Sequence, residues 1–166
     1  MGRSSNAVLV YGYDLGGPDE WKLRSLGQYG ELPSLDWYDD EDEDGDDSVD
    51  FATAAQDRLR AAVAGFTEEW TPDARETGYY DRRRAAEQSV GVKVESYCSH
   101  TSPMFALAAH VTTVHRGHVD YIDPQDLLDR PSTEDWDSRL IVAVEALDIV
   151  PIQEDPRWFL VSYGDL

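Results

Sequence analysis

Hydrophobic residues along this chain fall either into short continuous or alternating runs, or into longer runs with helical spacing. Residues 7–11 form an unbroken apolar run, which is typical of a strand buried on both faces. Residues 92–98 alternate imperfectly at period two, which indicates a strand with one buried face. Residues 157–163 are apolar on both faces, so we expect a strand that is internal or covered.

Apolar residues three or four positions apart predict the helices. Residues 51–66 carry such a stripe, with Asp50 placed to cap the first turn and Gly65 placed to end the last. Residues 79–89 and 136–147 are expected to form two more helices, and Ser132-x-x-Asp135 resembles a capping box before the second. Shorter helical pieces are expected at 21–26, after Thr71-Pro72 up to Gly78, and at 123–128.

The segment after the 92–98 strand supports two readings. Ser102-Pro103 has the form of a helix start and Arg116-Gly117 that of a helix end, with Met104, Leu107 and Val111 at helical spacing between them. We therefore predict a helix from Pro103 to about Arg116. The competing prediction is a strand through His110–His115, because Val-Thr-Thr-Val is rich in β-branched residues.

Breakers between these runs are interpreted as turns and connectors. Gly12–Pro18 is expected to be a tight turn with close backbone packing, because it lacks both the Gly-Lys-Ser/Thr ending and the Gly-x-Gly-x-x-Gly spacing of nucleotide loops. Residues 118–122 fit either a short edge strand or an extended connector. The order of elements predicts an α/β or α+β fold, with helices packed on a sheet of three or four strands joined by crossover connections.

Length and composition are typical of one globular domain, which we place at residues 1–166. The chain has 166 residues, 41% hydrophobic, and five tryptophans, enough for a real core. The first apolar run, about six residues long, is shorter than the apolar segment of a signal peptide or a membrane span. We therefore expect a cytoplasmic protein with no membrane partner. The single Cys98 excludes an internal disulfide.

Charge is the most unusual property of the sequence. The formal net charge is −20, which argues against direct binding of nucleic acid or an anionic membrane and is compatible with a basic protein partner. Ten of the fifteen residues in 36–50 are acidic, and like charges at this density favour an extended, flexible loop. The acidic residues predicted to bind the partner are Asp39, Asp40, Glu41, Asp42, Glu43, Asp44, Asp46 and Asp47.

Part of this acidic segment matches the opening of a calcium-binding EF-hand loop, in which alternating oxygens wrap a hard cation. The matching positions are Asp40, Asp42, Asp44 and Asp46, with Gly45 at the bend. Position twelve of such a loop should be a bidentate Glu and is Phe51 here. Calcium thus remains a possible ligand of the segment, and no other cofactor is expected.

Three consecutive arginines, Arg82–Arg84, cannot share one face of a helix, so we expect them to pair with acids rather than bind a phosphate. His110 and His115 are five residues apart, a poor spacing for a shared metal on a helix. Tyr97, Cys98 and His100 lie at the end of the 92–98 strand, where they could line the pocket of a small enzyme.

Several segments resemble a set of uncharacterised actinobacterial and actinophage proteins of similar length. The matching segments are Val10–Gly16, Tyr79–Glu87, Tyr97–Ser99, Pro103–Met104, Arg116–Gly117 and Pro156–Leu160. The resemblance implies a single-domain protein in a bacterial or phage setting. It implies no catalytic residues, because that set has no known activity.

Together these patterns favour a non-catalytic protein that engages a basic protein partner through acidic surface. Nucleic-acid mimics and inhibitor or immunity proteins are specific forms of this hypothesis. The alternatives are the small enzyme with a pocket near the end of the 92–98 strand, and a divalent-cation-binding loop. The identity of the partner and the oligomeric state stay open.

Overall fold

The computed structural model describes residues 5–39, 49–99 and 101–164, and all statements below concern these residues. None of its helices is both long enough and apolar enough to cross a bilayer. The elements, in chain order, are β1 (Ser5–Gly17), β2 (Glu20–Trp21), α1 (Phe51–Ala64), α2 (Pro72–Glu76), α3 (Tyr79–Val90), β3 (Lys93–Ser99), β4 (Ser102–His115), α4 (Pro124–Thr133), α5 (Trp136–Leu147) and β5 (Arg157–Gly164).

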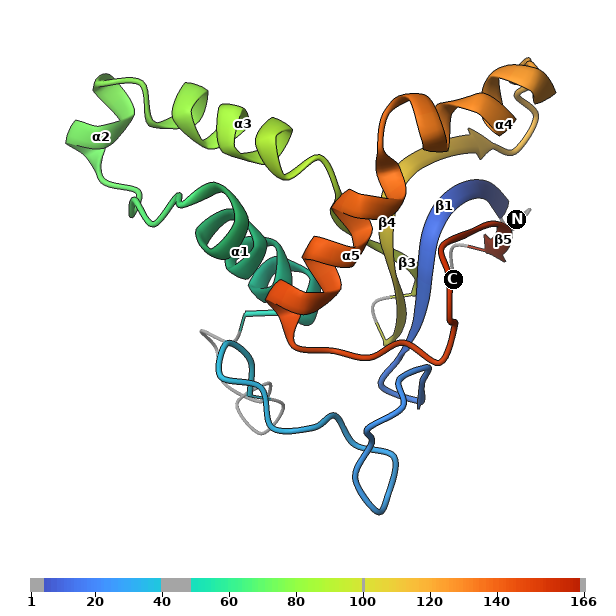
Figure 1. Ribbon diagram of the computed structural model, residues 1–166, viewed down its shortest axis with the longest axis horizontal. Helices are drawn as coiled ribbons and strands as arrows, with labels where there is room; N and C mark the ends of the chain where they lie inside the picture. Colours follow the sequence, from blue (N-terminus) through green and yellow to red (C-terminus); the bar gives the residue numbers. More distant parts are fainter. Residues whose placement is uncertain (1–4, 40–48, 100, 165–166) are drawn as a thin grey trace.

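The fold is α+β, with helices packed on a curled antiparallel sheet. The strand order is β2-β1-β4-β3, and β5 pairs with β1 beside the half of β1 that β2 does not reach. Figure 1 shows β1 bending strongly, with α2 and α3 projecting to one side of the molecule and α4 to the other. The predicted fold class is confirmed, although five strands are present rather than three or four, and every pair is antiparallel.

The predicted helix from Pro103 to Arg116 is wrong, because this segment is strand β4. It pairs with β1 from Phe105 to His115, and the competing strand prediction for the second half is therefore right. The misleading end signals mark the ends of a strand instead, and Gly117 adopts a positive φ of 83° in the turn that follows. Pairing with β1, about a hundred residues away in sequence, outweighs the local helical spacing.

The predicted turn at Gly12–Pro18 is also wrong, since β1 continues to Gly17. Two register shifts between β1 and β4 bend the strand, one between Tyr11 and Gly12 and one between Asp14 and Gly16. A Cβ at position 12 would overlap the Leu107 carbonyl, so the expected close backbone packing is present. The helical turn expected at 21–26 is absent; this stretch contains β2 and a bridge to the chain before β5.

The other helices agree with the sequence pattern. Helix α1 has Asp50 as its cap, whose side chain accepts from the Thr53 N–H, and Gly65 ends it in the left-handed conformation. Helices α2, α3 and α5 lie where the pattern placed them, and α4 extends to Thr133 rather than Leu128. The predicted capping box does not form, because Asp135 has a φ of 56° and makes no capping hydrogen bond.

The core has two parts, one on each face of the sheet. The larger lies between the sheet and helices α1 and α5, where Tyr13, Leu15 and Leu107 meet Leu59 and Leu140. The smaller lies on the opposite face and contains Val8, Val10, Tyr97, Ala106 and Ala108. The sheet curls over this second cluster, which brings the rings of Tyr97 in β3 and Tyr163 in β5 within 6.3 Å. Alternation along β1 and β4 thus supplies two cores from one sheet.

Two segments near the sheet edge correct or settle smaller predictions. Strand β5 pairs only with β1, and its Leu160 is 77% exposed, so the expectation of an internal or covered strand is wrong. Residues 118–122 form an extended connector rather than an edge strand. Both findings leave apolar side chains on the surface.

Candidate functional site

The predicted acidic site lies mostly outside the described residues. Positions 40–48 are not described, so the structure places Asp39 alone among the eight predicted partner-binding acids; Asp39 is exposed. None of the four predicted calcium ligands, Asp40, Asp42, Asp44 and Asp46, is placed. Phe51, at position twelve of the EF-hand pattern, is 1% exposed within the core and cannot face a cation. The described residues contain no group of three His, Cys, Asp or Glu side chains that could hold a metal.

The structure places two of the three predicted pocket residues at the smaller core cluster. Tyr97 is part of that cluster and Cys98 packs against it, whereas His100 lies outside the described residues. Cys98 also lines a cavity of about 780 Å³ together with Ser96, Thr101 and Phe105. Burial raises the pKa of the Cys98 thiol, which lowers the fraction of thiolate at neutral pH. This environment is unfavourable for a cysteine nucleophile.

Tyr97 also belongs to a polar cluster with Asp14 and Lys22. Its hydroxyl donates to Asp14 Oδ1 at 3.3 Å, and Lys22 Nζ forms an ion pair with Asp14 Oδ2 at 2.6 Å. Burial, followed by the negative charge of Asp14, raises the pKa of Tyr97. The phenol therefore stays protonated. The cluster links β1, β3 and the residue that follows β2 in one structural network.

The arginines on α3 pair with acids, as expected. Arg82 bonds both oxygens of Glu68, Arg83 contacts Glu87, and Arg84 contacts Asp81. Six further cations among the described residues also form ion pairs with acids. Most positive charge is thus matched locally, which leaves the excess acid on a few surfaces.

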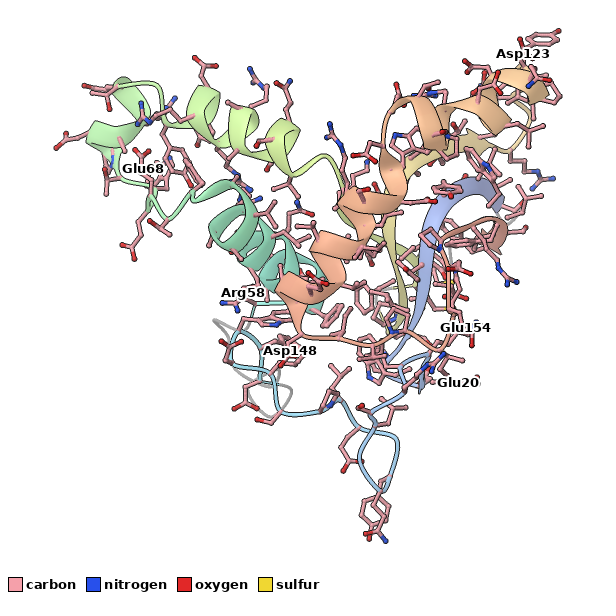
Figure 2. All side chains as sticks on the ribbon, viewed as in Figure 1. Glu20, Arg58, Glu68, Asp123, Asp148 and Glu154 are labelled. Carbon is pink, nitrogen blue, oxygen red and sulfur yellow. The ribbon has the colours of Figure 1, made fainter. Side chains whose placement is uncertain are left out.

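One of these surfaces is what we term the arm, residues 116–137, which comprises the connector after β4, helix α4 and the start of α5. Figure 2 shows Asp123 at its far tip. The arm contains seven exposed acids and, within 120–137, a single base, Arg130. Only Glu134 of the seven has an ion-pair partner among the described residues, Arg130 at 3.2 Å. The seven acids are Asp120, Asp123, Asp126, Asp129, Glu134, Asp135 and Asp137.

Apolar side chains are exposed between these carboxylates. Val119 is 76% exposed, Tyr121 92%, Ile122 55% and Leu128 69%. Exposed groups of this kind rimmed by polar residues are typical of protein interaction surfaces. The arm therefore combines apolar anchors with a strongly negative surround.

The arm is held firmly to the body at its base. The Arg130 guanidinium lies 5.0 Å from the centre of the Trp136 ring, and His110 of β4 stacks against the same ring at 5.4 Å. The Tyr11 hydroxyl donates to Asp137 Oδ1 at 2.6 Å, and burial, followed by this bond, raises the pKa of Tyr11. Burial lowers the pKa of His110. These contacts fix the direction in which α4 projects.

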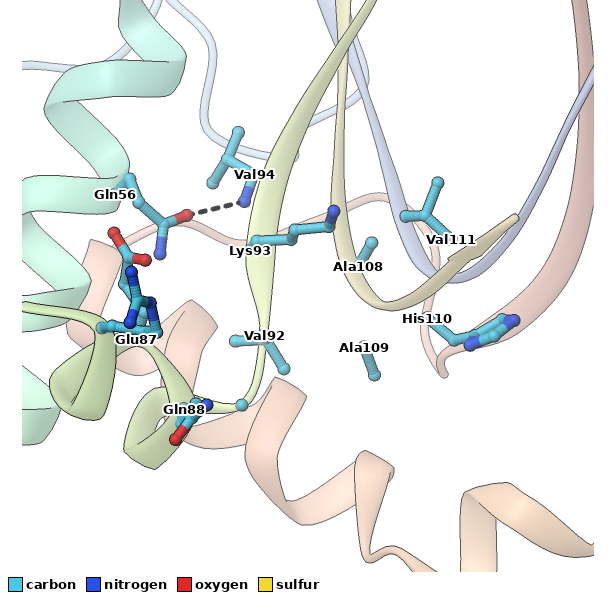
Figure 3. Close-up of a pocket in the computed structure, with 12 residues that line it drawn as sticks. Gln56, Glu87, Gln88, Val92, Lys93, Val94, Ala108, Ala109, His110 and Val111 are labelled. Atoms are coloured by element: carbon cyan, nitrogen blue, oxygen red, sulfur yellow. Dashed lines mark hydrogen bonds between the residues drawn. The ribbon is translucent and has the colours of Figure 1, made fainter. Parts of the chain in front are cut away.

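A second surface feature is a groove of about 510 Å³ at the step where β3 begins beside β4. Figure 3 shows the groove between the end of α3, the start of β3 and the middle of β4. Gln56 of α1 reaches across to accept a hydrogen bond from the Val94 N–H at 3.0 Å. Ala108, Ala109 and His110 form the β4 side. We refer to it as the step groove.

Cations gather at the end of the step groove nearest α3. Arg84 and Lys93 line it, and the guanidinium of Arg139, from α5, lies directly over Gly91. No ion pair involves Arg139 among the described residues, whereas Glu87 is already bonded by Arg60 at 2.9 Å. Arg84 and Lys93 are already ion-paired, with Asp81 at 3.3 Å and with Glu95 respectively, so Arg139 is the one of these three cations whose charge is not matched among the described residues.

Sequence reasoning found neither feature. The aspartates at 120, 123, 126 and 129 do recur every three residues, a visible signal in the sequence that the denser acidic run obscured; in the structure only Asp126 and Asp129 lie on α4. The step groove has no such signal, because its three cations come from α3, β3 and α5. Comparison with known proteins adds no relative: no family model, no curated protein and no solved structure matches the chain.

Proposed function

We propose that this chain is a non-catalytic binding protein that engages a basic protein partner through the arm. The observation that carries the proposal is the combination of seven exposed carboxylates within 120–137 with four exposed apolar side chains. Apolar and aromatic anchors supply most of the binding free energy of protein interfaces, and charges around them select the partner. A cationic protein surface with apolar recesses is the complement of the arm.

The spacing of the acids supports a more specific form of the proposal. Asp126 and Asp129 stand three residues apart on α4, which places their side chains about 5–6 Å apart on one face, and Asp123 lies three residues before them. Asp123 also caps α4 by accepting from the Gln125 N–H at 3.0 Å, so the row begins at an ordered helix end. A regular row of carboxylates on a rigid helix is what imitation of a nucleic-acid backbone requires. Such a protein would inhibit an enzyme or repressor that binds nucleic acid.

The acidic segment 36–50 contributes to the same proposal in a different way. Its ten acids equal half of the net charge, and charge of this density attracts a cationic partner over about one Debye length, roughly 10 Å at 0.1 M salt. Steering raises the association rate, whereas close contacts on the arm lower the dissociation rate. We assign steering to residues 36–50 and docking to the arm.

The test is capture of partners from a lysate of the encoding cell by the immobilised chain, at about 50 mM and about 500 mM salt. An arm variant carries Asp123→Asn, Asp126→Asn and Asp129→Asn; asparagine can still cap α4, so the fold should persist. A matched control replaces three exposed acids elsewhere, Glu69, Glu76 and Glu145, with glutamine, which removes the same charge.

Basic proteins should be retained by the native chain and the control, and lost from the arm variant. Retention should also fall at the higher salt concentration. If the arm variant retains the same proteins as the control, the arm is not the docking surface and the proposal fails. Purified partners should then show slower association with a 36–50 variant and faster dissociation from the arm variant.

A further inference from the structure

Strand β4 has an outer edge that β3 covers only in part. β3 pairs with residues 102–108, whereas residues 109–115 continue the strand with β1 alone on the other side. Among the described residues, no hydrogen bond reaches the outer side of the backbone at 109–114. Six residues of strand span about 20 Å. An unpaired edge of this length is a template for another strand.

The direction of the backbone groups on β1 follows from its contacts with Gln153. The Asp14 N–H donates to Gln153 Oε1 at 3.2 Å, and the Gly12 carbonyl accepts from Gln153 Nε2 at 2.7 Å. Asp14 and Gly12 therefore direct these groups away from β4. Because directions alternate along a strand, Tyr11 and Leu9 direct theirs toward β4.

The same alternation identifies the free groups on β4. His110 and Thr112 are the register partners of Tyr11 and Leu9, so their N–H and C=O groups bond β1. Val111 and Thr113 consequently direct theirs outward, along the free edge. Ala109, Val111 and the positions between them also border the step groove. The free edge and the groove form one continuous site.

We propose that this site takes an extended peptide segment, which adds to β4 as a strand in line with β3 and places a carboxylate beside Arg139. β3 runs antiparallel to β4 and begins at Lys93, opposite Ala108. A segment that pairs with residues 109–114 of β4 in the same direction as β3 has its carboxyl end next to the start of β3, close to Gly91 and to the Arg139 guanidinium above it. Main-chain bonds to β4 supply affinity, and Arg139 selects the end group.

Charge favours such a peptide over a second copy of this chain. Two copies would bring net charges of −20 together along the edge, whereas a short acid-terminated segment meets Arg139, which has no ion-pair partner among the described residues. The site adjoins the base of the arm, where His110 stacks against Trp136, but does not depend on the function proposed above. Its carboxylate could come from a chain terminus or from an acidic side chain.

The experiment titrates pooled pentapeptides into the full-length ¹⁵N-labelled chain and follows backbone amide resonances. The inner positions are Val, Thr, Ile or Tyr, which favour extended backbone. One pool ends in valine with a free carboxylate, a second in amidated glutamate, and a third in amidated lysine. The two acid-bearing pools should shift the Val111 and Thr113 amides saturably, and the tighter pool identifies the source of the carboxylate. The lysine pool should bind about tenfold more weakly.

Main-chain pairing and the cations are tested separately. The peptide amides fall into two alternating sets, of which one faces β4. N-methylation of the set that faces β4 should weaken binding about tenfold, because it removes the bonds to Val111 and Thr113. Arg139→Gln should weaken only the acid-bearing pools. Arg157→Gln, which removes an exposed cation on β5, is the matched control and should bind normally.

Three results would overturn the proposal. The first is no shift at these amides with any pool at about 1 mM. The second is that peptides N-methylated at either set of alternate amides bind as tightly as the unmodified peptides. The third is a concentration-dependent dimer whose interface shifts Val111 and Thr113, because the edge would then join two copies of the chain.

Discussion

Phe51 follows the acidic segment directly and anchors it to the body. Its ring is 1% exposed and lies 4.9 Å from Trp21, 5.5 Å from Trp37, 5.3 Å from Tyr38 and 5.0 Å from Phe105, measured between ring centres. These neighbours come from β2, the start of the acidic segment, and β4. The ring therefore joins the two ends of that segment to the sheet, and its removal should affect the whole fold.

Truncation to Phe51→Ala should lower the free energy of unfolding by about 3–5 kcal/mol, the cost of deleting a fully buried phenylalanine and leaving a cavity. Each aromatic pair accounts for about 0.5–1.5 kcal/mol beyond its buried area, so four pairs place the loss in the upper part of that range. Domains of this kind are stable by about 5–15 kcal/mol, so the variant should still fold in water. With a urea dependence of about 2 kcal/mol per molar, the midpoint should fall by roughly 2 M.

The assay is urea unfolding followed by tryptophan fluorescence and by circular dichroism. Phe51→Leu leaves a smaller cavity than Phe51→Ala but also loses the four aromatic pairs, so it should destabilise the fold by a smaller amount than Phe51→Ala does. Leu160→Ala, at a side chain 77% exposed, should stay within about 0.5 kcal/mol. A loss below about 1 kcal/mol for Phe51→Ala, with an unchanged dependence on urea, would refute the central place of this ring.

Three further predictions test the sheet, a buried histidine and the cysteine. Gly12→Ala should destabilise by about 1–3 kcal/mol, because a Cβ there overlaps the Leu107 carbonyl at the bend of β1; an unchanged thermal midpoint would contradict the bulge geometry. His110 has its pKa lowered by burial from 6.5, so the unfolded chain binds the extra proton first: stability is full above about pH 6.5 and declines as pH falls toward the lowered pKa. When the free energy of unfolding is measured with urea at a series of pH values, His110→Gln should make this decline smaller. An equal dependence on pH in both proteins would count against the role of His110. Cys98, with its pKa raised by burial, should react with a disulfide reagent at neutral pH more slowly than a free thiol does; faster labelling would reopen the cysteine nucleophile.

Local chemistry was sufficient where an element depends on its own neighbours. Helix α1 begins at the Asp50 cap and ends at Gly65 because both signals act within one turn of the helix they delimit. The pairing of Arg82–Arg84 with acids was predictable for the same reason, since two of the three partners, Asp81 and Glu87, lie on the same helix.

Prediction failed where a partner distant in sequence decides the outcome. Residues 103–116 carry both helix-end signals and β-branched residues, and only pairing with β1 selects the strand. The exposure of Leu160 depends on which strand lies beside β5, and the contact of Tyr97 with Tyr163 depends on how far the sheet curls. None of these has a local signature.

By itself, the sequence determined the class of fold, three of the longer helices, and a charge that sets the chemistry of any partner. Net charge is a sum over residues, and helix stripes and caps depend on residues close in sequence. Residue types and spacing are therefore enough to establish these properties. Tertiary structure alone decided that β4 is a strand with a free edge, that Arg139 of α5 lies over Gly91 beside the step groove, and that acids of the arm lie among exposed apolar residues. Each of these is a coincidence in space of segments far apart in the chain, created by antiparallel pairing and by the curl of one sheet.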